Sequence, residues 1–205
     1  MRKQERESRR TGQATKVFEL QITLLDIEPA IWRRFTVTDD ATLAELHRIV
    51  QLVMGWMGGH LHEFEAPDGR RYAATDPGLN PDGPGPDVGD AQSVTLREVL
   101  RRPGERIHYV YDFGDGWEHH IQLVEIRDAK PSESVPLCLG GERACPPEDC
   151  GGPWGYTELL EALANPGHER HEEFTEWLSD YQAVGFDPEA FALEELNAFL
   201  RSSTA

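Results

Sequence analysis

The dipeptide Asp115-Gly116 limits the fold more than any other feature, because it lies between two stretches of strand-forming residues, 107–113 and 117–126. Asp-Gly is a strong signal for a tight hairpin, since both central residues of a two-residue turn need positive φ. With the turn at these residues, Asp112 faces His119 and their Cβ atoms lie roughly 5 Å apart. The sequence therefore predicts an antiparallel hairpin in which an acid and a histidine share a hydrogen bond.

The first half of the chain has the pattern of a small α+β unit. Alternating apolar and polar residues predict strands over 17–25, 31–37 and 61–66. Thr42-Leu43-Ala44-Glu45 is a capping box, in which the Thr hydroxyl and the Glu carboxylate satisfy backbone amides at a helix start. The helix should run to about Met54, because a glycine follows it.

The last third of the chain is predicted to be helical, over 156–164, 168–181 and 188–200. The final helix has the clearest start, with Asp187 as N-cap and Pro188 at its first position. The predicted fold class is therefore α+β, with a mixed or antiparallel sheet, a helix packed on it and a helical C-terminal third.

Two stretches are expected to lie outside the core. Residues 1–15 form a basic tail, which could touch nucleic acid or an acidic partner but is more typical of a solvated, disordered end. Residues 74–93 are rich in Pro, Gly and Asp, and we expect a long exposed loop that is either disordered or a functional lid. The rest of the chain, 16–201, is predicted to form a single domain.

Charge and composition exclude several classes of protein. The chain has 205 residues and a net charge of −17, and its basic residues are concentrated in the tail. The acidic body should repel phosphate backbones, so we do not expect it to bind nucleic acid directly. Three cysteines do not suggest a disulfide framework, and no apolar run approaches the roughly 18 residues of a membrane span. We therefore expect a cytoplasmic protein without a membrane segment.

Two groups of acids and histidines are candidates for chemistry. The predicted Asp112–His119 pair suits a general base held by a carboxylate, or a metal-ligating histidine with its supporting acid. Its structural alternative is a buried polar pair that satisfies itself. His60 and His62 would point to the same face of a strand, as a metal-binding or acid–base patch, or as two histidines on the rim of a sheet.

A cysteine-rich loop supplies further candidate ligands. Cys138, Cys145 and Cys150 would form a zinc site with one histidine, although their spacing lacks the usual close pair, and the alternative is three inert thiols. Glu148 and Asp149 are adjacent carboxylates in a Gly/Pro-rich loop before a helix. They suit a metal or acid catalysis, and they equally suit a turn or a helix start.

Several short motifs follow one another in a fixed order: Ile31-Trp32-Arg33-Arg34, Gly55-Trp56 with residues 60–64, the hairpin 111–119, and residues 147–152 with Gly155-Tyr156. Together they are specific, and over about residues 17–200 the chain resembles the plasmid pRiA4b ORF-3-like family. The resemblance implies an α+β fold and no established activity. Family members occur on plasmids and in some insertion elements, some with a resolvase-type label. This chain shows neither a nucleophilic Ser among Arg residues nor a basic DNA-binding domain.

The resemblance also implies a set of site residues. The family's signature polar residues map here onto His60, His62, Asp112, Asp115, His119, Glu148 and Asp149. Relatives often carry an apolar residue at the position of Cys150, which argues against a zinc ligand there. The candidate catalytic residues are Asp112, His119, Glu148 and Asp149, and the candidate binding residues are His60, His62, Asp115, Trp117 and Tyr156.

Two functions fit these observations. The first is a non-catalytic accessory module, associated with plasmids or transposable elements, that binds a protein partner through its acidic surface. The alternative is a metal-assisted hydrolase built from the candidate catalytic residues with His60 or His62. Geometry separates the two, because convergence of these side chains in a cleft favours the enzyme, and their scattering or pairing in the core favours the module.

Overall fold

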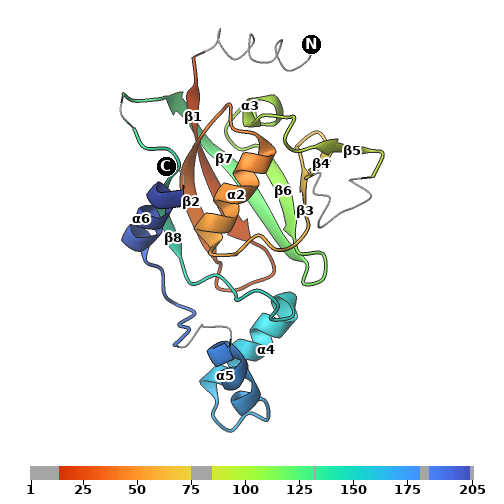
Figure 1. Cartoon of the computed structure of the whole chain (residues 1–205), viewed down its shortest axis with the longest axis vertical. Helices are drawn as coiled ribbons and strands as arrows, with labels where there is room; N and C mark the ends of the chain where they lie inside the picture. The colour runs from red at the N-terminus through yellow and green to blue at the C-terminus, as the bar shows by residue number, and fades with distance from the viewer. Residues whose placement is uncertain (1–13, 75–84, 132, 181–184, 204–205) are drawn as a thin grey trace.

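The structure, a computed structural model of the chain, describes residues 14–74, 85–131, 133–180 and 185–203 (Figure 1). Within these residues it contains one eight-stranded sheet and five helices. The strands are β1 (Lys16–Leu24), β2 (Trp32–Thr38), β3 (His62–Glu65), β4 (Arg71–Ala73), β5 (Val88–Asp90), β6 (Arg106–Tyr111), β7 (Trp117–Asp128) and β8 (Leu137–Glu142). The helices are α2 (Leu43–Met54), α3 (Leu96–Val99), α4 (Gly152–Ala164), α5 (His171–Asp180) and α6 (Leu193–Ser203).

The sheet has the strand order β5-β4-β3-β6-β7-β1-β2-β8. Only the β4–β5 pair is parallel within the described residues, so the sheet is mixed and mostly antiparallel. Inward-facing residues of the long strands β1 and β7 are apolar and buried, which is the period-two pattern of a half-buried strand. The α+β fold class, with three helices in the C-terminal region, is confirmed.

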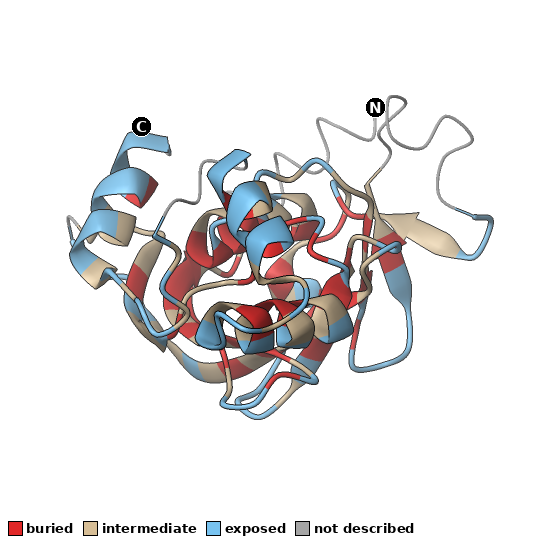
Figure 2. Ribbon diagram, turned by 90° about the horizontal axis from the view of Figure 1, so that it is seen from below, coloured by how far each residue is buried: buried red, intermediate tan, exposed pale blue. Residues whose placement is uncertain are grey.

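Helix α2 crosses one face of the sheet (Figure 1). It begins as predicted, because the Thr42 side chain accepts from the Glu45 N–H and the Glu45 side chain accepts from the Thr42 N–H. It ends at Gly55, whose φ of 94° is the left-handed conformation of a helix C-cap. Figure 2 shows buried residues along the sheet and on this helix, whereas the C-terminal helix α6 is mostly exposed.

The β6–β7 hairpin has a different register from the predicted one. Tyr109 pairs with His119 and Tyr111 pairs with Trp117, so the loop contains five residues rather than two. Asp112 leaves the strand with a φ of 56°, and its carbonyl accepts from the Gly116 N–H at 2.6 Å. The predicted Asp112–His119 pair is therefore wrong, because the wider loop takes Asp112 out of the ladder.

Gly116 nevertheless has the backbone conformation that the hairpin prediction required. Its φ is 68°, and a Cβ added there would meet no heavy atom within 4 Å, so any penalty comes from the backbone alone. We expect Gly116→Val to lower the free energy of unfolding by about 1–3 kcal/mol, because a β-branched residue resists positive φ. Urea denaturation measures the loss. Gly116→Asn should cost less, since Asn tolerates this region, and equal losses would contradict the explanation.

Several other boundaries differ from the sequence predictions. The final helix begins at Leu193, because Asp187 caps a turn through the Glu189 N–H instead of a helix. The predicted loop 74–93 contains strand β5 and the buried Ala91. Its residues 75–84 lie outside the described part of the chain. Residues 1–13 of the predicted tail also lie outside the described part. Strand β8 was missed, because its two glycines resemble a loop. The single domain over 16–201 stays a prediction.

Candidate functional site

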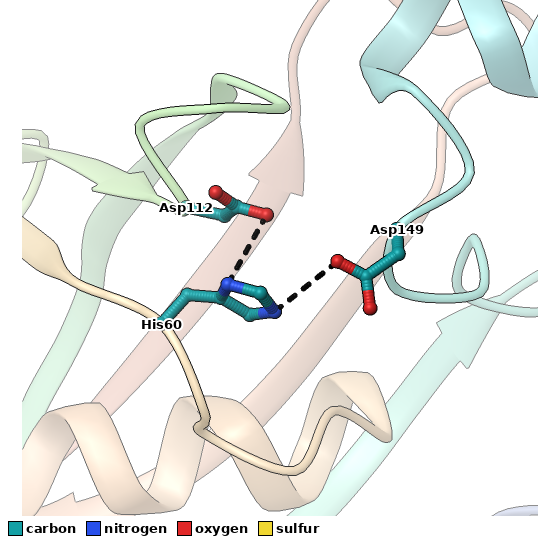
Figure 3. Close-up of side chains that lie close together, drawn as sticks. All are labelled: His60, Asp112 and Asp149. Atoms are coloured by element: carbon teal, nitrogen blue, oxygen red, sulfur yellow. Dashed lines mark ion pairs between the residues drawn. The ribbon is translucent and has the colours of Figure 1, made fainter.

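Three loops meet at the end of the sheet where the β6–β7 hairpin turns. The His60 ring lies between two carboxylates, with Nδ1 3.5 Å from Asp112 Oδ2 and Nε2 3.6 Å from Asp149 Oδ1 (Figure 3). One ligand atom from each side chain lies within 4.8 Å of the others. In the described residues this is the one group of three or more His, Cys, Asp or Glu side chains close enough to share a metal ion. We call these three residues the His60 cluster.

Both carboxylates of the His60 cluster are presented by an unusual backbone. Asp112 and Asp149 have φ values of 56° and 60°, in the left-handed region that Asp tolerates better than most residues. The Asp112 N–H donates to the Leu61 carbonyl at 2.9 Å, which fixes the hairpin loop against the segment that carries His60. The Asp112 Oδ1 accepts from the Gly114 N–H at 2.9 Å, so Oδ2 remains for His60.

A close approach of two backbones brings Asp149 to the hairpin loop. A Cβ added to Gly152 would lie 2.2 Å from the Asp115 carbonyl oxygen, which is closer than atoms can pack. Asp115 also accepts from the Gly151 N–H at 3.3 Å. Glycine at 152 therefore lets the loop that holds Asp149 rest on the hairpin. Asp115, a predicted binding residue, joins the two loops without entering the His60 cluster.

Glu148 lies beneath the His60 cluster and is buried. Its Oε1 accepts a short hydrogen bond from the Tyr111 hydroxyl, and its Oε2 accepts from the Met57 N–H at 3.2 Å. Burial, followed by the hydrogen bond to Glu148 and its charge, raises the pKa of Tyr111 well above its ordinary value. Glu148 thus connects the loop that carries Asp149 to β6 and to the segment after α2.

Four other candidate residues lie in the core. His119 and Trp117 are fully buried on β7, and Tyr156 is fully buried on α4. Burial lowers the pKa of His119 to about 3, so the ring is neutral at physiological pH. His62 is also buried, and its ring stacks on His47 of α2 at a centroid distance of 3.5 Å. These side chains are not part of the His60 cluster.

The three cysteines do not converge. Cys138 lies at the start of β8, where its thiol donates to the carbonyls of Arg34 and Gly140, both at 3.5 Å. Cys145 and Cys150 lie further along, and all three thiols are free. Burial raises the pKa of Cys150 to about 12, which keeps it protonated. The arrangement gives no support to the predicted zinc site at these residues.

A cavity of about 640 Å³ opens beside the His60 cluster, between α2, the segment after it and β3. We call it the α2–β3 cavity. His60 and His62 both line it, as do Met57 and Phe113, whose side chains are 80% and 56% exposed. Sequence analysis missed two further polar residues of its lining, His47 and Gln51. The sequence does contain a signal for them, because two polar residues at i and i+4 interrupt the apolar face of the predicted helix.

Comparison with known proteins supports the resemblance. The sequence profile of the plasmid pRiA4b ORF-3-like protein family matches residues 16–195. The chain belongs to this family. It is 41% identical over 187 residues to an uncharacterized protein of Sinorhizobium fredii, y4hQ, with coverage of 89% of this chain and 93% of the relative. The crystal structure of MM3350 from Methanosarcina mazei Go1, a protein of unknown function, is similar with a TM-score of 0.77 and 34% identity, over 89% of this chain and 98% of that one.

The two relatives suggest no function for this chain, because one is described as uncharacterized and the other as a protein of unknown function. None of the helices in the described residues is long and apolar enough to cross a membrane. Function must therefore be argued from the His60 cluster and the α2–β3 cavity.

Proposed function

We propose that the His60 cluster is a divalent-cation site and that the protein is a metal-assisted hydrolase. The observation that carries this proposal is the convergence of one imidazole and two carboxylates from three separate segments, with their ligand atoms within 4.8 Å. Three protein ligands leave coordination positions open, as catalytic metal sites do. A mixed nitrogen and oxygen set suits Zn²⁺ or Mn²⁺ better than Ca²⁺, which prefers oxygen ligands alone.

The surroundings of the His60 cluster support a catalytic role. A bound cation would lower the pKa of a coordinated water and polarise a substrate carbonyl or phosphoryl oxygen. The protein supplies the rigid frame, because Asp112 is fixed by the Leu61 carbonyl and Asp149 by the neighbouring Glu148. The α2–β3 cavity, which His60 also lines, offers room for a substrate beside the cation. His119, a predicted catalytic residue, has no part in this proposal because it lies in the core.

Titration of metal-stripped protein with Zn²⁺ and with Mn²⁺ tests the site. We expect binding of one ion, weaker as the pH is lowered, because the ligands must lose their protons to bind. Asp112→Asn and Asp149→Asn should each weaken binding at least tenfold, a loss on the order of 1.4 kcal/mol. Asn tolerates the left-handed backbone at both positions, so these variants should keep the loops in place.

The matched control is Asp68→Asn, because Asp68 is an exposed acid in another hairpin turn, paired with Arg70. This variant should bind the ion as the unmodified protein does. Unchanged affinity in both the Asp112 and the Asp149 variants would contradict the proposed site. Elemental analysis of the purified protein gives an independent measure of which metal it carries.

A second candidate function is the non-catalytic module that binds a protein partner. It is favoured by large apolar side chains exposed around the same end of the molecule: Met57, Phe113 and Trp154, the last 89% exposed in the first turn of α4. Exposed aromatic residues and Met are enriched in protein interfaces. A protein that contains no metal and binds neither added ion would favour this function. A cytoplasmic location and an association with plasmids or mobile elements belong to this second proposal.

A further inference from the structure

We propose that the α2–β3 cavity is the substrate pocket and that it takes a small uncharged molecule with a carboxamide-type edge, a carbonyl beside an N–H. This inference rests on the proposed hydrolase function and names its substrate class. The volume of about 640 Å³ lies within the range of small-molecule sites. Much of the lining is apolar, as such sites require: Ala44, Leu52, Trp56, Leu61 and Val88.

Two polar residues of the cavity lining, Gln51 and His47, share the hydroxyl of Tyr109. The Tyr109 hydroxyl accepts from Gln51 Nε2 at 3.0 Å and lies 2.8 Å from His47 Nδ1. The hydroxyl has one proton, which it can donate to His47 Nδ1, and the neutral ring then carries its own proton on Nε2. This chain of hydrogen bonds leaves Gln51 Oε1 as an acceptor and His47 Nε2–H as a donor.

These two atoms both lie close to Gly58. A Cβ added to Gly58, which also lines the cavity, would be 3.8 Å from Gln51 Oε1 and 3.8 Å from His47 Nε2. Gln51 is buried, and its Oε1 has no hydrogen-bond partner among the described residues. Buried polar atoms in folded proteins are nearly always paired, so this acceptor calls for a ligand donor or a water. Gln51 Oε1 would accept from the N–H of an amide, and His47 Nε2–H would donate to its carbonyl.

The cavity also selects against charge. Burial, then the neighbouring His62 and Arg48, lowers the pKa of His47 to about 3, so no cation lines the inner wall to pair with an anion. Two charged side chains line the cavity: Arg48, which is exposed, and Glu63, which is half-buried and bonded to Arg71. An uncharged ligand is therefore favoured.

The position of the cavity connects binding to the proposed chemistry. Gly58 is two residues before His60, so an amide held there lies next to the His60 cluster. Hydrolysis would form a bond from the water oxygen to the amide carbon and break the carbon–nitrogen bond. The leaving nitrogen would take the proton from the water, giving a carboxylic acid and an amine or ammonia.

Binding of benzamide to the EDTA-treated full-length protein tests the pocket without metal. We expect saturable binding of one benzamide by ligand-observed NMR or calorimetry, and at least tenfold weaker binding of benzoate, which has the same ring but a negative charge. Ala44→Phe should abolish benzamide binding by filling the cavity, because Ala44 lines it from α2. Leu139→Phe, on the exposed side of β8 and outside the lining, is the matched control and should bind normally.

Asp149→Asn separates this inference from the proposed metal site. Asp149 does not line the cavity, so the variant should lose the cation and keep benzamide binding. If the variant loses benzamide as well, the amide binds at the His60 cluster and the pocket assignment is overturned. Equal affinity for benzoate and benzamide, or full benzamide binding by Ala44→Phe, would also overturn it. If the protein binds benzamide but no metal ion, the hydrolase proposal is contradicted while the assignment of the cavity as an amide-binding pocket stands.

Discussion

Replacement of Arg33 by Leu is expected to lower the free energy of unfolding by about 3–5 kcal/mol, because it leaves several buried carbonyls without a donor. The Arg33 guanidinium is 3% exposed and donates to four backbone carbonyls at 2.6–3.1 Å. These belong to Val53 at the end of α2, Trp32 on β2, Glu142 on β8 and Arg143 after it. One side chain thus joins β2 and the edge strand β8 to the helix that covers the sheet.

Urea denaturation of the Arg33→Leu protein measures the loss. Arg33→Lys should also destabilise, since an ammonium cannot reproduce the planar fork of donors. Arg102→Leu is the matched control, because the Arg102 side chain is 82% exposed and its one ion pair in the described part of the chain is with Glu105, three residues away. Such a surface pair is worth about 0–1 kcal/mol, so this variant should remain within that range of the unmodified protein. A small loss for Arg33→Leu would mean that water or a rearranged loop satisfies the carbonyls.

The elements that sequence predicted best are those that local chemistry determines. The capping box at Thr42 and the glycine after α2 fix both helix ends through contacts within a few residues. The final helix shows the limit of such signals. Asp187 makes the expected side-chain bond to a nearby amide, but the bond closes a turn, and the helix begins at Leu193.

Hairpin register could not be predicted from the turn residues alone. Asp115-Gly116 matches the pattern of a two-residue turn, and Gly116 does have positive φ. Asp112 also adopts positive φ, which widens the loop to five residues and changes every cross-strand pair. The cause is tertiary, because the Asp112 N–H bonds to the Leu61 carbonyl and Gly152 packs on Asp115. Neither contact has a signature near the hairpin in sequence.

The three residues of the His60 cluster were all among the candidates, but their grouping was not predicted. His60 and Asp149 come from loops almost 90 residues apart, and they meet because Gly152 allows two backbones to approach closely. Sequence reasoning paired Asp112 with His119, which lies on β7 in the core. A histidine in a strand and a histidine in a loop look alike in sequence, whereas burial decides which one can bind a ligand.

Acid is expected to destabilise this protein well before its carboxylates are protonated. Burial lowers the pKa of both His47 and His119 to about 3, against an ordinary value of about 6.5 for an unfolded chain. Between these values the unfolded state binds protons that the native state excludes, so stability falls as the pH falls below 6.5. Each histidine can contribute a slope of about 1.4 kcal/mol per pH unit. The two together should remove about 4 kcal/mol between pH 7 and pH 5, a large share of a typical total of 5–15 kcal/mol.

The carboxylates change the stability in a lower pH range than the histidines do. A hydrogen bond from Arg127, with a smaller effect from Lys130, lowers the pKa of Glu133 to about 2. Its contribution is present above the ordinary Glu pKa of about 4.3 and is lost only as the pH falls from there toward 2. Loss of stability between pH 7 and pH 5 therefore reports on buried histidines. Urea denaturation at pH 7.5, 6 and 5, in buffer with EDTA to keep metal from the His60 cluster, measures it.

The variant His119→Phe tests whether the buried ring of His119 causes part of the loss of stability between pH 7 and pH 5. His119 Nε2 has no hydrogen-bond partner in the described part of the chain, while the ring bonds to the backbone of Tyr109, at 3.3 Å from Nδ1, and to the backbone of Trp117. A Phe ring removes the proton site, and because it is larger than imidazole the measured quantity is the slope of stability against pH and not the stability at one pH. The variant should lose less stability on acidification, with a slope flatter by about 1.4 kcal/mol per pH unit. An unchanged slope in His119→Phe would contradict this assignment, because it would mean that His119 takes up its proton in the native state through a local opening of the β6–β7 hairpin.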